Sequence, residues 1–190
     1  MNGPDRLSPR QLLLTELLAA PAARSAANDP NRGLLAGIVA GQATGHGCLP
    51  ADLGLGVASF AHIRHEYFPG VDLPAVERQA PALPEHDELL GLLLGERARE
   101  FRSEALIATI VATACAGHDH LWQDLGLGSR DELTRLMWIN FPSLARANSG
   151  DMKWKKFLYR LLCSREGIYV CPAPSCGVCT DFAQCFGPEN

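Results

Sequence analysis

The sequence has no excess of positive charge and no apolar stretch long enough to span a membrane. The net charge is -4 and the pI is about 5.8, whereas nucleic-acid binders usually carry a basic excess. The apolar stretch at residues 105–116 is well short of the roughly 20 residues that a transmembrane helix needs. We therefore expect no nucleic-acid partner and no membrane partner.

The apolar run at residues 12–20 lacks the uninterrupted character of a signal peptide, because Glu16 lies inside it. Its leucines, Leu12, Leu13, Leu17 and Leu18, have the spacing of one helical face. These two features predict an amphipathic helix in a cytoplasmic protein.

Alternation of apolar and polar residues, the pattern of a half-buried strand, is also missing. Proline and glycine clusters divide the chain into segments with helical spacing instead. These segments are 9–20, 34–43, 55–68, 85–116 as one long or two abutting helices, 131–140, and one from Trp154 through Phe157 and Leu158 to Leu161. Ser129 and Glu132 have the spacing of a capping box at a helix start, and Pro21–Pro30 is typical of a loop.

These segments predict an all-α fold. Hydrophobic residues make up 47% of the chain, enough for a sizeable core. After Gly167, helix-forming residues give way to Cys, Pro and Gly. We expect a single compact helical domain over residues 1–167, with an irregular, Cys-rich metal-binding loop over residues 168–190 packed on it.

The cysteines lack the even distribution of a disulfide framework. Four of the seven lie close together at the C-terminus, as Cys171, Cys176, Cys179 and Cys185, with the spacing Cys-x4-Cys-x2-Cys-x5-Cys. Crowded cysteines in a chain without export features more often bind metal or carry out redox chemistry. The prolines and glycines between them keep the segment out of regular helix, so four thiolates can converge on one centre.

The spacing leaves three chemistries open. The first three cysteines share the Cys-x4-Cys-x2-Cys spacing of plant-type ferredoxins, which favours an iron-sulfur cluster. Zinc also takes four cysteines, but its structural sites generally pair two knuckles separated by a dozen or more residues. A redox-active dithiol is the third possibility.

Several longer motifs resemble one family. They are the run Met152–Cys163, Glu166-Gly167, the cysteine motif that ends in Phe186-Gly187-Pro188-Glu189, and the upstream segments His120–Leu127 and Phe141–Ala145. Together they are similar to the NifQ family of the nitrogen-fixation system. The resemblance is dense from about His118 to the C-terminus.

The resemblance implies a non-enzymatic carrier that holds molybdenum in a molybdenum-iron-sulfur (Mo-Fe-S) cluster. The carrier would take molybdate as its metal source and donate molybdenum for synthesis of the nitrogenase iron-molybdenum cofactor. The family's cluster ligands match Cys171, Cys176, Cys179 and Cys185 position by position. The implied partners are the scaffold and reductase proteins of cofactor maturation.

Two other functions remain open. The chain could catalyse molybdenum insertion into a preformed iron-sulfur cluster, which would give several turnovers per protein. It could also be a zinc-stapled helical interaction module, in which the metal supplies folding energy alone.

Other polar residues are weaker site candidates. His118, Asp119 and His120 could complete the coordination of a molybdenum or iron atom, or Asp119 could cap a helix beside two structural histidines. Cys163 is a reserve ligand. The cluster Lys153, Lys155, Lys156 and Arg160 could face an anionic centre or form the solvated face of a helix. We expect Cys48 and Cys115, and the tryptophans Trp122, Trp138 and Trp154, to pack in the core.

Overall fold

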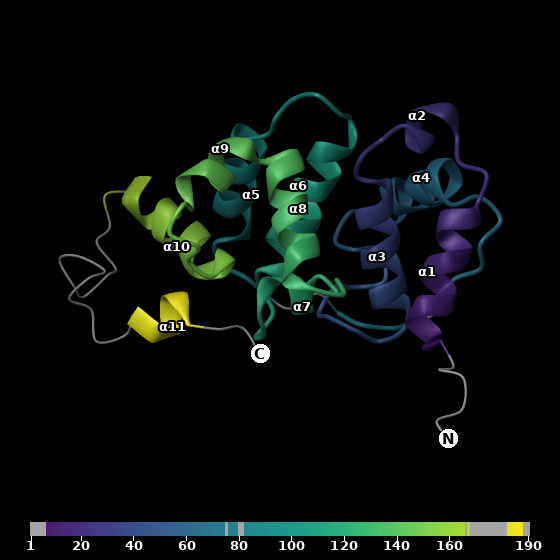
Figure 1. The fold of residues 1–190 in the computed structure, drawn as a ribbon, viewed down its shortest axis with the longest axis horizontal. Coiled ribbons are helices and arrows are strands. Elements are labelled where there is room, and N and C mark those ends of the chain that lie inside the picture. Colours follow the sequence, from purple (N-terminus) through teal and green to yellow (C-terminus); the bar gives the residue numbers. More distant parts are fainter. Residues whose placement is uncertain (1–6, 75, 80–81, 166, 168–181, 188–190) are drawn as a thin grey trace, which may run out of the picture.

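The computed structural model describes residues 7–74, 76–79, 82–165, 167 and 182–187. Within these residues the chain forms helices and no strand (Figure 1), which confirms the predicted all-α class. The helices are α1 (Pro9–Ala19), α2 (Arg24–Ala27), α3 (Arg32–Ala43), α4 (Val57–Tyr67), α5 (His86–Gly95), α6 (Ser103–Ala114), α7 (Leu121–Asp124), α8 (Arg130–Asn140), α9 (Pro142–Ala147), α10 (Trp154–Arg165) and α11 (Phe182–Phe186). One continuous hydrophobic core joins α1 to α10 into a single compact domain.

Helix α1 begins at Pro9, the predicted start, and Ser8 caps it. The Ser8 hydroxyl accepts the N–H of Gln11 (3.2 Å), and the Gln11 side chain accepts the N–H of Ser8 (2.7 Å), so two otherwise unpaired amides are satisfied. Pro9 occupies the first helical position, where its missing N–H costs nothing. The predicted helix at 9–20 is therefore confirmed.

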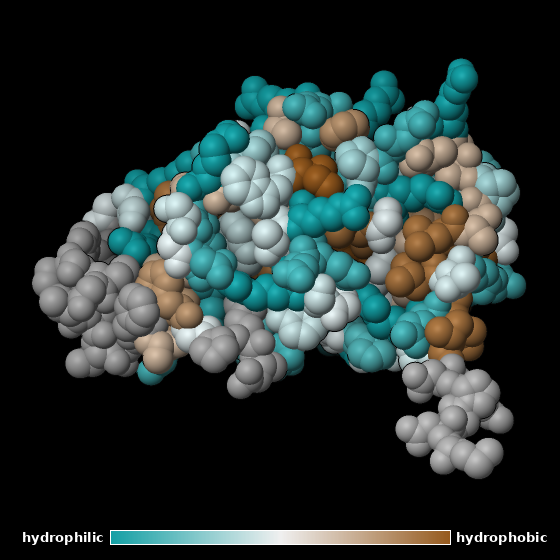
Figure 2. Space-filling model, viewed as in Figure 1, coloured by the Kyte–Doolittle hydropathy of each residue, from teal (hydrophilic) through white to brown (hydrophobic). Residues whose placement is uncertain are grey.

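The predicted leucine face of α1 is only partly correct. Leu13 and Leu17 are buried, but Leu12 and Leu18 are exposed. Figure 2 shows apolar surface over the part of the molecule where α1 lies. The main packing partner of α1 is α3, and Leu13 and Leu17 are the residues of α1 that are buried.

Helices α3 and α6 form the centre of the fold. Every residue from Leu34 to Ala43 is buried, as is nearly all of α6. A helix that is buried on all sides needs partners on all sides. Helix α1 packs against α3, and α5 packs against α6 and α10.

A buried amide network ties these helices together. The Asn31 side chain donates to the Ser103 hydroxyl (2.8 Å) and exchanges hydrogen bonds with the Asn140 side chain (2.8 Å each way). All three residues are fully buried, and buried polar groups are tolerated when they are paired in this way. The network joins the start of α3, the start of α6 and the end of α8.

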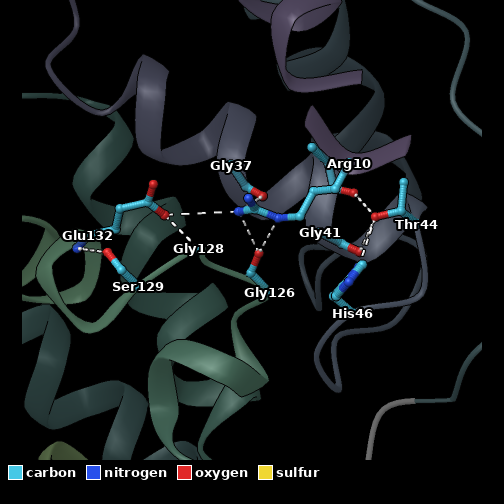
Figure 3. Close-up of polar contacts among 10 residues, drawn as sticks. Arg10, Gly37, Gly41, Thr44, His46, Gly126, Gly128, Ser129 and Glu132 are labelled. Atoms are coloured by element: carbon cyan, nitrogen blue, oxygen red, sulfur yellow. Dashed lines mark hydrogen bonds and ion pairs between the residues drawn. The ribbon is translucent and has the colours of Figure 1, made fainter. Parts of the chain in front are cut away.

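The backbone of residue Gly126 lies directly against α3. A Cβ atom at Gly41 would lie 2.2 Å from the Gly126 carbonyl oxygen, so no larger residue fits there without movement. The Arg10 guanidinium donates to the same carbonyl through Nε (3.2 Å) and Nη2 (3.0 Å) and lies 4.0 Å from the Glu132 carboxylate (Figure 3). Helix α1 is thereby attached to the loop before α8.

The capping box predicted at the start of α8 is half formed. The Ser129 hydroxyl accepts the Glu132 N–H (3.3 Å), as expected. The Glu132 carboxylate instead accepts the N–H of Gly128 (2.7 Å) and faces Arg10. The nearby guanidinium and the Gly128 amide draw the carboxylate away from Ser129.

The segment 85–116 forms two helices separated by residues 96–102. The break is stabilised by Glu104, a fully buried carboxylate that accepts the N–H groups of Arg99 (2.6 Å), Glu100 (2.8 Å) and Phe101 (2.9 Å). Three amide donors satisfy the buried charge and fix the turn. The two helices are therefore not abutting.

Three further expectations need correction. The segment Pro21–Pro30 is not entirely loop, because it contains α2. The C-terminal segment 168–190 is not irregular throughout, because it contains α11. Trp154 is buried and Trp122 packs partly buried on the core, but Trp138 is 50% exposed and is no core anchor. Trp138 follows Met137 on α8, and the core-facing side of that helix is already filled by Leu133, Leu136 and Met137.

Candidate metal-binding site and adjacent pocket

The four predicted ligands are only partly covered by the structure. Cys171, Cys176 and Cys179 lie outside the described residues, as does most of the predicted domain 168–190, so that boundary stays a prediction. Cys185 is described: it is partly buried on α11, and its carbonyl oxygen accepts the N–H of Lys153 (2.8 Å). This bond holds α11 beside the start of α10 (Figure 1).

A polar pocket of about 410 Å³ lies at this junction. The loop after α6 contributes His118, Asp119 and His120, the start of α10 contributes Lys153, Lys155 and Lys156, and α11 contributes Gln184, the neighbour of Cys185. Buried Leu121 and Trp154 supply apolar wall. Two groups that the sequence separates by more than thirty positions, the histidine loop and the lysine cluster, therefore line one cavity.

Asp124 is a buried residue that holds two parts of the pocket lining together. It is 2% exposed, and its carboxylate accepts the N–H of Asp119 (3.0 Å) and forms an ion pair with the Lys155 ammonium. Lys155 also donates to the Gly117 carbonyl oxygen (2.9 Å). The charge of Lys155 is thus neutralised internally, and α10 is connected to the loop 117–119.

Gly117 leaves the space that this anchor needs. A Cβ atom there would lie 2.2 Å from Oδ1 of Asp124, so any other residue would displace the carboxylate. Sequence reasoning missed Asp124, Gly117 and Gln184. A glycine directly before His118 was the available signal, but the pairing of Asp124 with Lys155 depends on a long-range contact that no local spacing predicts.

The predicted helix cap at Asp119 is wrong. Helix α7 begins after His120, whose backbone N–H donates to the Gln123 side chain (3.2 Å), while the side chain of Asp119 is exposed. The N–H of Asp119 donates to the Asp124 carboxylate. This bond positions the backbone so that His120, the next residue, takes the N-cap position. Of the two histidines expected to be structural, His118 is exposed at the pocket, whereas His120 is partly buried and caps α7.

The histidine loop does not form a metal site by itself. The described residues contain no group of three or more His, Cys, Asp or Glu side chains placed to hold a metal ion. Any metal role for His118, Asp119 and His120 therefore needs ligands from elsewhere, as the prediction of a completing role already assumed. Cys163 is partly buried on α10, and its role as a reserve ligand stays a prediction.

The two upstream cysteines pack as expected. Burial raises the pKa of the Cys115 thiol to about 12 and that of the Cys48 thiol to about 11, with the Asp124 carboxylate adding to the second effect. Cys48 also donates a weak hydrogen bond to the Ala114 carbonyl oxygen (3.6 Å). Both remain protonated thiols at neutral pH and suit a packing role.

The basic cluster divides into two parts. Lys155 is held by Asp124, whereas the ammonium groups of Lys153 and Lys156 form no ion pair within the described residues and line the pocket. On the other side of α10, Trp154 and Leu158 are buried, and Phe157 and Leu161 are partly buried against the core, as predicted. Lys155 is therefore part of the folded structure, whereas a role of Lys153 and Lys156 toward an anionic centre stays a prediction.

Fold and pocket together define an all-helical protein with a lysine-lined cavity beside the last cysteine of a Cys-rich C-terminal segment. The NifQ family model matches residues 34–187, a range that includes every pocket residue and all four cysteines. The chain belongs to the NifQ family, a family of nitrogen-fixation proteins, as the sequence motifs indicated.

Individual relatives agree with this assignment. The chain is 41% identical to Protein NifQ of Azotobacter vinelandii over 80% of this chain and 86% of the relative. It is 38% identical to Protein NifQ of Rhodobacter capsulatus over 77% and 82%, and 46% identical to Protein NifQ of Klebsiella pneumoniae over 42% and 48%. No solved structure matches the chain. In the described part of the chain, no helix has the length and apolar character to cross a membrane.

Proposed function

We propose that this protein is a cytoplasmic carrier that holds molybdenum in a Mo-Fe-S cluster and donates it for synthesis of the nitrogenase iron-molybdenum cofactor. Family membership supports the nitrogen-fixation role, and the Cys-x4-Cys-x2-Cys-x5-Cys motif supports the cluster. In this proposal the thiolates of Cys171, Cys176, Cys179 and Cys185 are the cluster ligands. The cluster is cargo, and the protein carries out no catalytic turnover.

The observation that carries the proposal furthest is the attachment of Cys185. Its carbonyl oxygen accepts the Lys153 N–H, so the last cysteine of the motif is fixed to the helical domain at the edge of the lysine-lined pocket. Thiolate-ligated clusters are anionic, and nearby positive charge stabilises them. The lysines at the start of α10 supply that charge.

The proposed partners are the scaffold and reductase proteins of cofactor maturation. A carrier must release its metal as well as bind it. Thiolate ligands hold iron firmly, so molybdenum needs a more weakly bound position in the cluster from which it can leave. Contact with a partner at the exposed side of α11 and of the histidine loop would place the recipient next to the cargo.

Elemental analysis tests the cluster and its ligands together. Protein is isolated without oxygen from cells supplied with molybdate, and molybdenum, iron and zinc are measured per chain. We expect iron and molybdenum in the parent protein and neither in a Cys176→Ala, Cys179→Ala variant. The matched control, Cys48→Ala with Cys115→Ala, also removes two thiols, but these are protonated and packed; it should keep both metals.

Zinc alone, in a colourless parent protein, would contradict the proposal and leave a zinc-stapled interaction module. Full metal content in the Cys176→Ala, Cys179→Ala variant would contradict the assigned ligands.

A further inference from the structure

The pocket beside Cys185 has an unusual distribution of basic residues. The chain contains three lysines, Lys153, Lys155 and Lys156, and all three line this cavity. Apart from histidine, every other basic residue of the chain is an arginine. Arginine favours fixed bidentate contacts, while lysine is a compact, strongly hydrated charge with three rotatable donors. Lysine therefore suits an anion that must be bound and then released.

Helix geometry adds further donors. Trp154, Lys155 and Lys156 are the first three residues of the twelve-residue helix α10, and the N–H groups of a first helical turn have no partner within the helix. The positive end of the helix dipole is directed to the same place. The cavity, the lysines and the helix start are separate features that converge at one position.

The charge balance of the pocket is positive. Lys155 is neutralised by buried Asp124. Among the residues that the structure describes, this leaves the ammonium groups of Lys153 and Lys156 against one lining carboxylate, that of Asp119. The imidazole of His118, which is exposed at the pocket, adds one further polar group to the lining. This balance is local, because the chain as a whole carries a net charge of -4.

The pocket is large and polar enough to admit a hydrated oxyanion. About 10–15 Å³ of such volume holds one water molecule, so about 410 Å³ admits a tetrahedral oxyanion with part of its hydration shell. The walls at Leu121 and Trp154 are buried and apolar, which strengthens the attraction between the anion and the ammonium groups.

We propose that this pocket is an entry site for molybdate, bound as a tetrahedral dianion by Lys153 and Lys156 before its metal reaches the cysteine motif. The assignment of the anion rests on the proposed function, whereas the assignment of an oxyanion site rests on the pocket itself. Lys153 belongs to both places, because its side chain lines the pocket and its N–H binds the carbonyl oxygen of Cys185. The step is binding alone, with no bond to oxygen broken.

Equilibrium dialysis of the full-length, metal-free protein against radiolabelled molybdate tests the site. We expect saturable binding that weakens as salt increases, because the contacts are ionic. A Lys153→Gln, Lys156→Gln variant should bind at least about tenfold more weakly. The matched control, Arg135→Gln with Arg146→Gln, removes the same charge from two exposed positions on α8 and α9 and should bind within about twofold of the parent.

Three outcomes would overturn the proposal: no saturable binding, equal weakening in the lysine variant and the arginine control, or displacement of molybdate by sulfate or phosphate at equal concentration. The same dialysis on the Cys176→Ala, Cys179→Ala chain separates the two proposals. We expect it to bind molybdate like the parent although it holds no cluster, so loss of pocket binding and loss of the cluster are measured independently.

Discussion

The ion pair between Asp124 and Lys155 should contribute more to stability than any other charge pair near the pocket. The Asp124 side chain is 3% exposed and that of Lys155 is 17% exposed. Replacing Lys155 with Met therefore leaves a buried carboxylate without its cationic partner, although the Asp119 N–H still donates to it. Breaking a buried pair from one side costs about 3–5 kcal/mol. Because water reaches Lys155, we expect the lower end, about 3 kcal/mol.

For a chain of this size, a loss of about 3 kcal/mol lowers Tm by about 6–12 °C. The Asp124→Asn variant should lose less, about 1–2 kcal/mol, because the unpaired Lys155 ammonium can turn to solvent and the amide still accepts the Asp119 N–H. The double variant Asp124→Asn, Lys155→Met buries no charge, so its loss should be smaller than the sum of the single losses by at least about 1 kcal/mol.

The parent, the two single variants and the double variant form a double-mutant cycle, and urea denaturation measures the free energy of unfolding of each. Lys156→Met is the matched control, since it removes an exposed lysine one position away and should change the free energy of unfolding by less than about 0.5 kcal/mol. If Lys155→Met were as stable as Lys156→Met, the reasoning on a buried, charge-dependent anchor would be refuted.

Three further predictions concern the fold. Gly41→Ala should destabilise the protein by at least about 2 kcal/mol in urea denaturation, because its Cβ would lie 2.2 Å from a carbonyl oxygen of the loop before α8; a neutral result would mean that this loop shifts freely. Cys115, whose pKa burial raises to about 12, should resist iodoacetamide at pH 8 until the protein is unfolded, and rapid labelling by mass spectrometry would contradict its burial. The Ser143 hydroxyl and then the Arg165 guanidinium lower the pKa of Glu96. The stabilisation from Glu96 should therefore be complete above the ordinary glutamate pKa and be lost as pH falls through the lowered pKa. Glu96→Gln should destabilise the protein at pH 7, and the loss measured by thermal unfolding should shrink as pH is lowered; a loss that does not change with pH would contradict the lowered pKa.

Helix positions were predictable from local signals because proline, glycine and capping residues act within a few positions of themselves. Pro9 starts α1 where the sequence indicates, and Ser129 caps α8 as predicted. The failures have long-range causes. Buried Glu104 binds three amides and breaks the segment 85–116 into two helices, and no hydrophobic period records such a contact.

The candidate site also has features that the sequence predicts and features that depend on long-range contacts. Cysteine spacing and family motifs indicate the ligand set without any knowledge of the fold. The pocket could not be predicted, because it depends on Asp124 bringing the loop of Asp119 against Lys155. The histidine loop and the lysine cluster were each noticed in the sequence, but their meeting in one cavity required the structure.

Molybdenum transfer from the isolated protein tests the central claim most directly. The metal-loaded protein, freed of molybdate, is supplied without oxygen as the sole molybdenum source to the scaffold and reductase proteins of cofactor maturation, and molybdenum in the finished cofactor is counted per chain. The carrier account predicts transfer that stops when the molybdenum brought by the chain is used up, and none from the Cys176→Ala, Cys179→Ala variant. No transfer from the loaded protein, or many molybdenum atoms delivered per chain once molybdate is added, would contradict a stoichiometric carrier, and the second result would identify a catalyst of insertion.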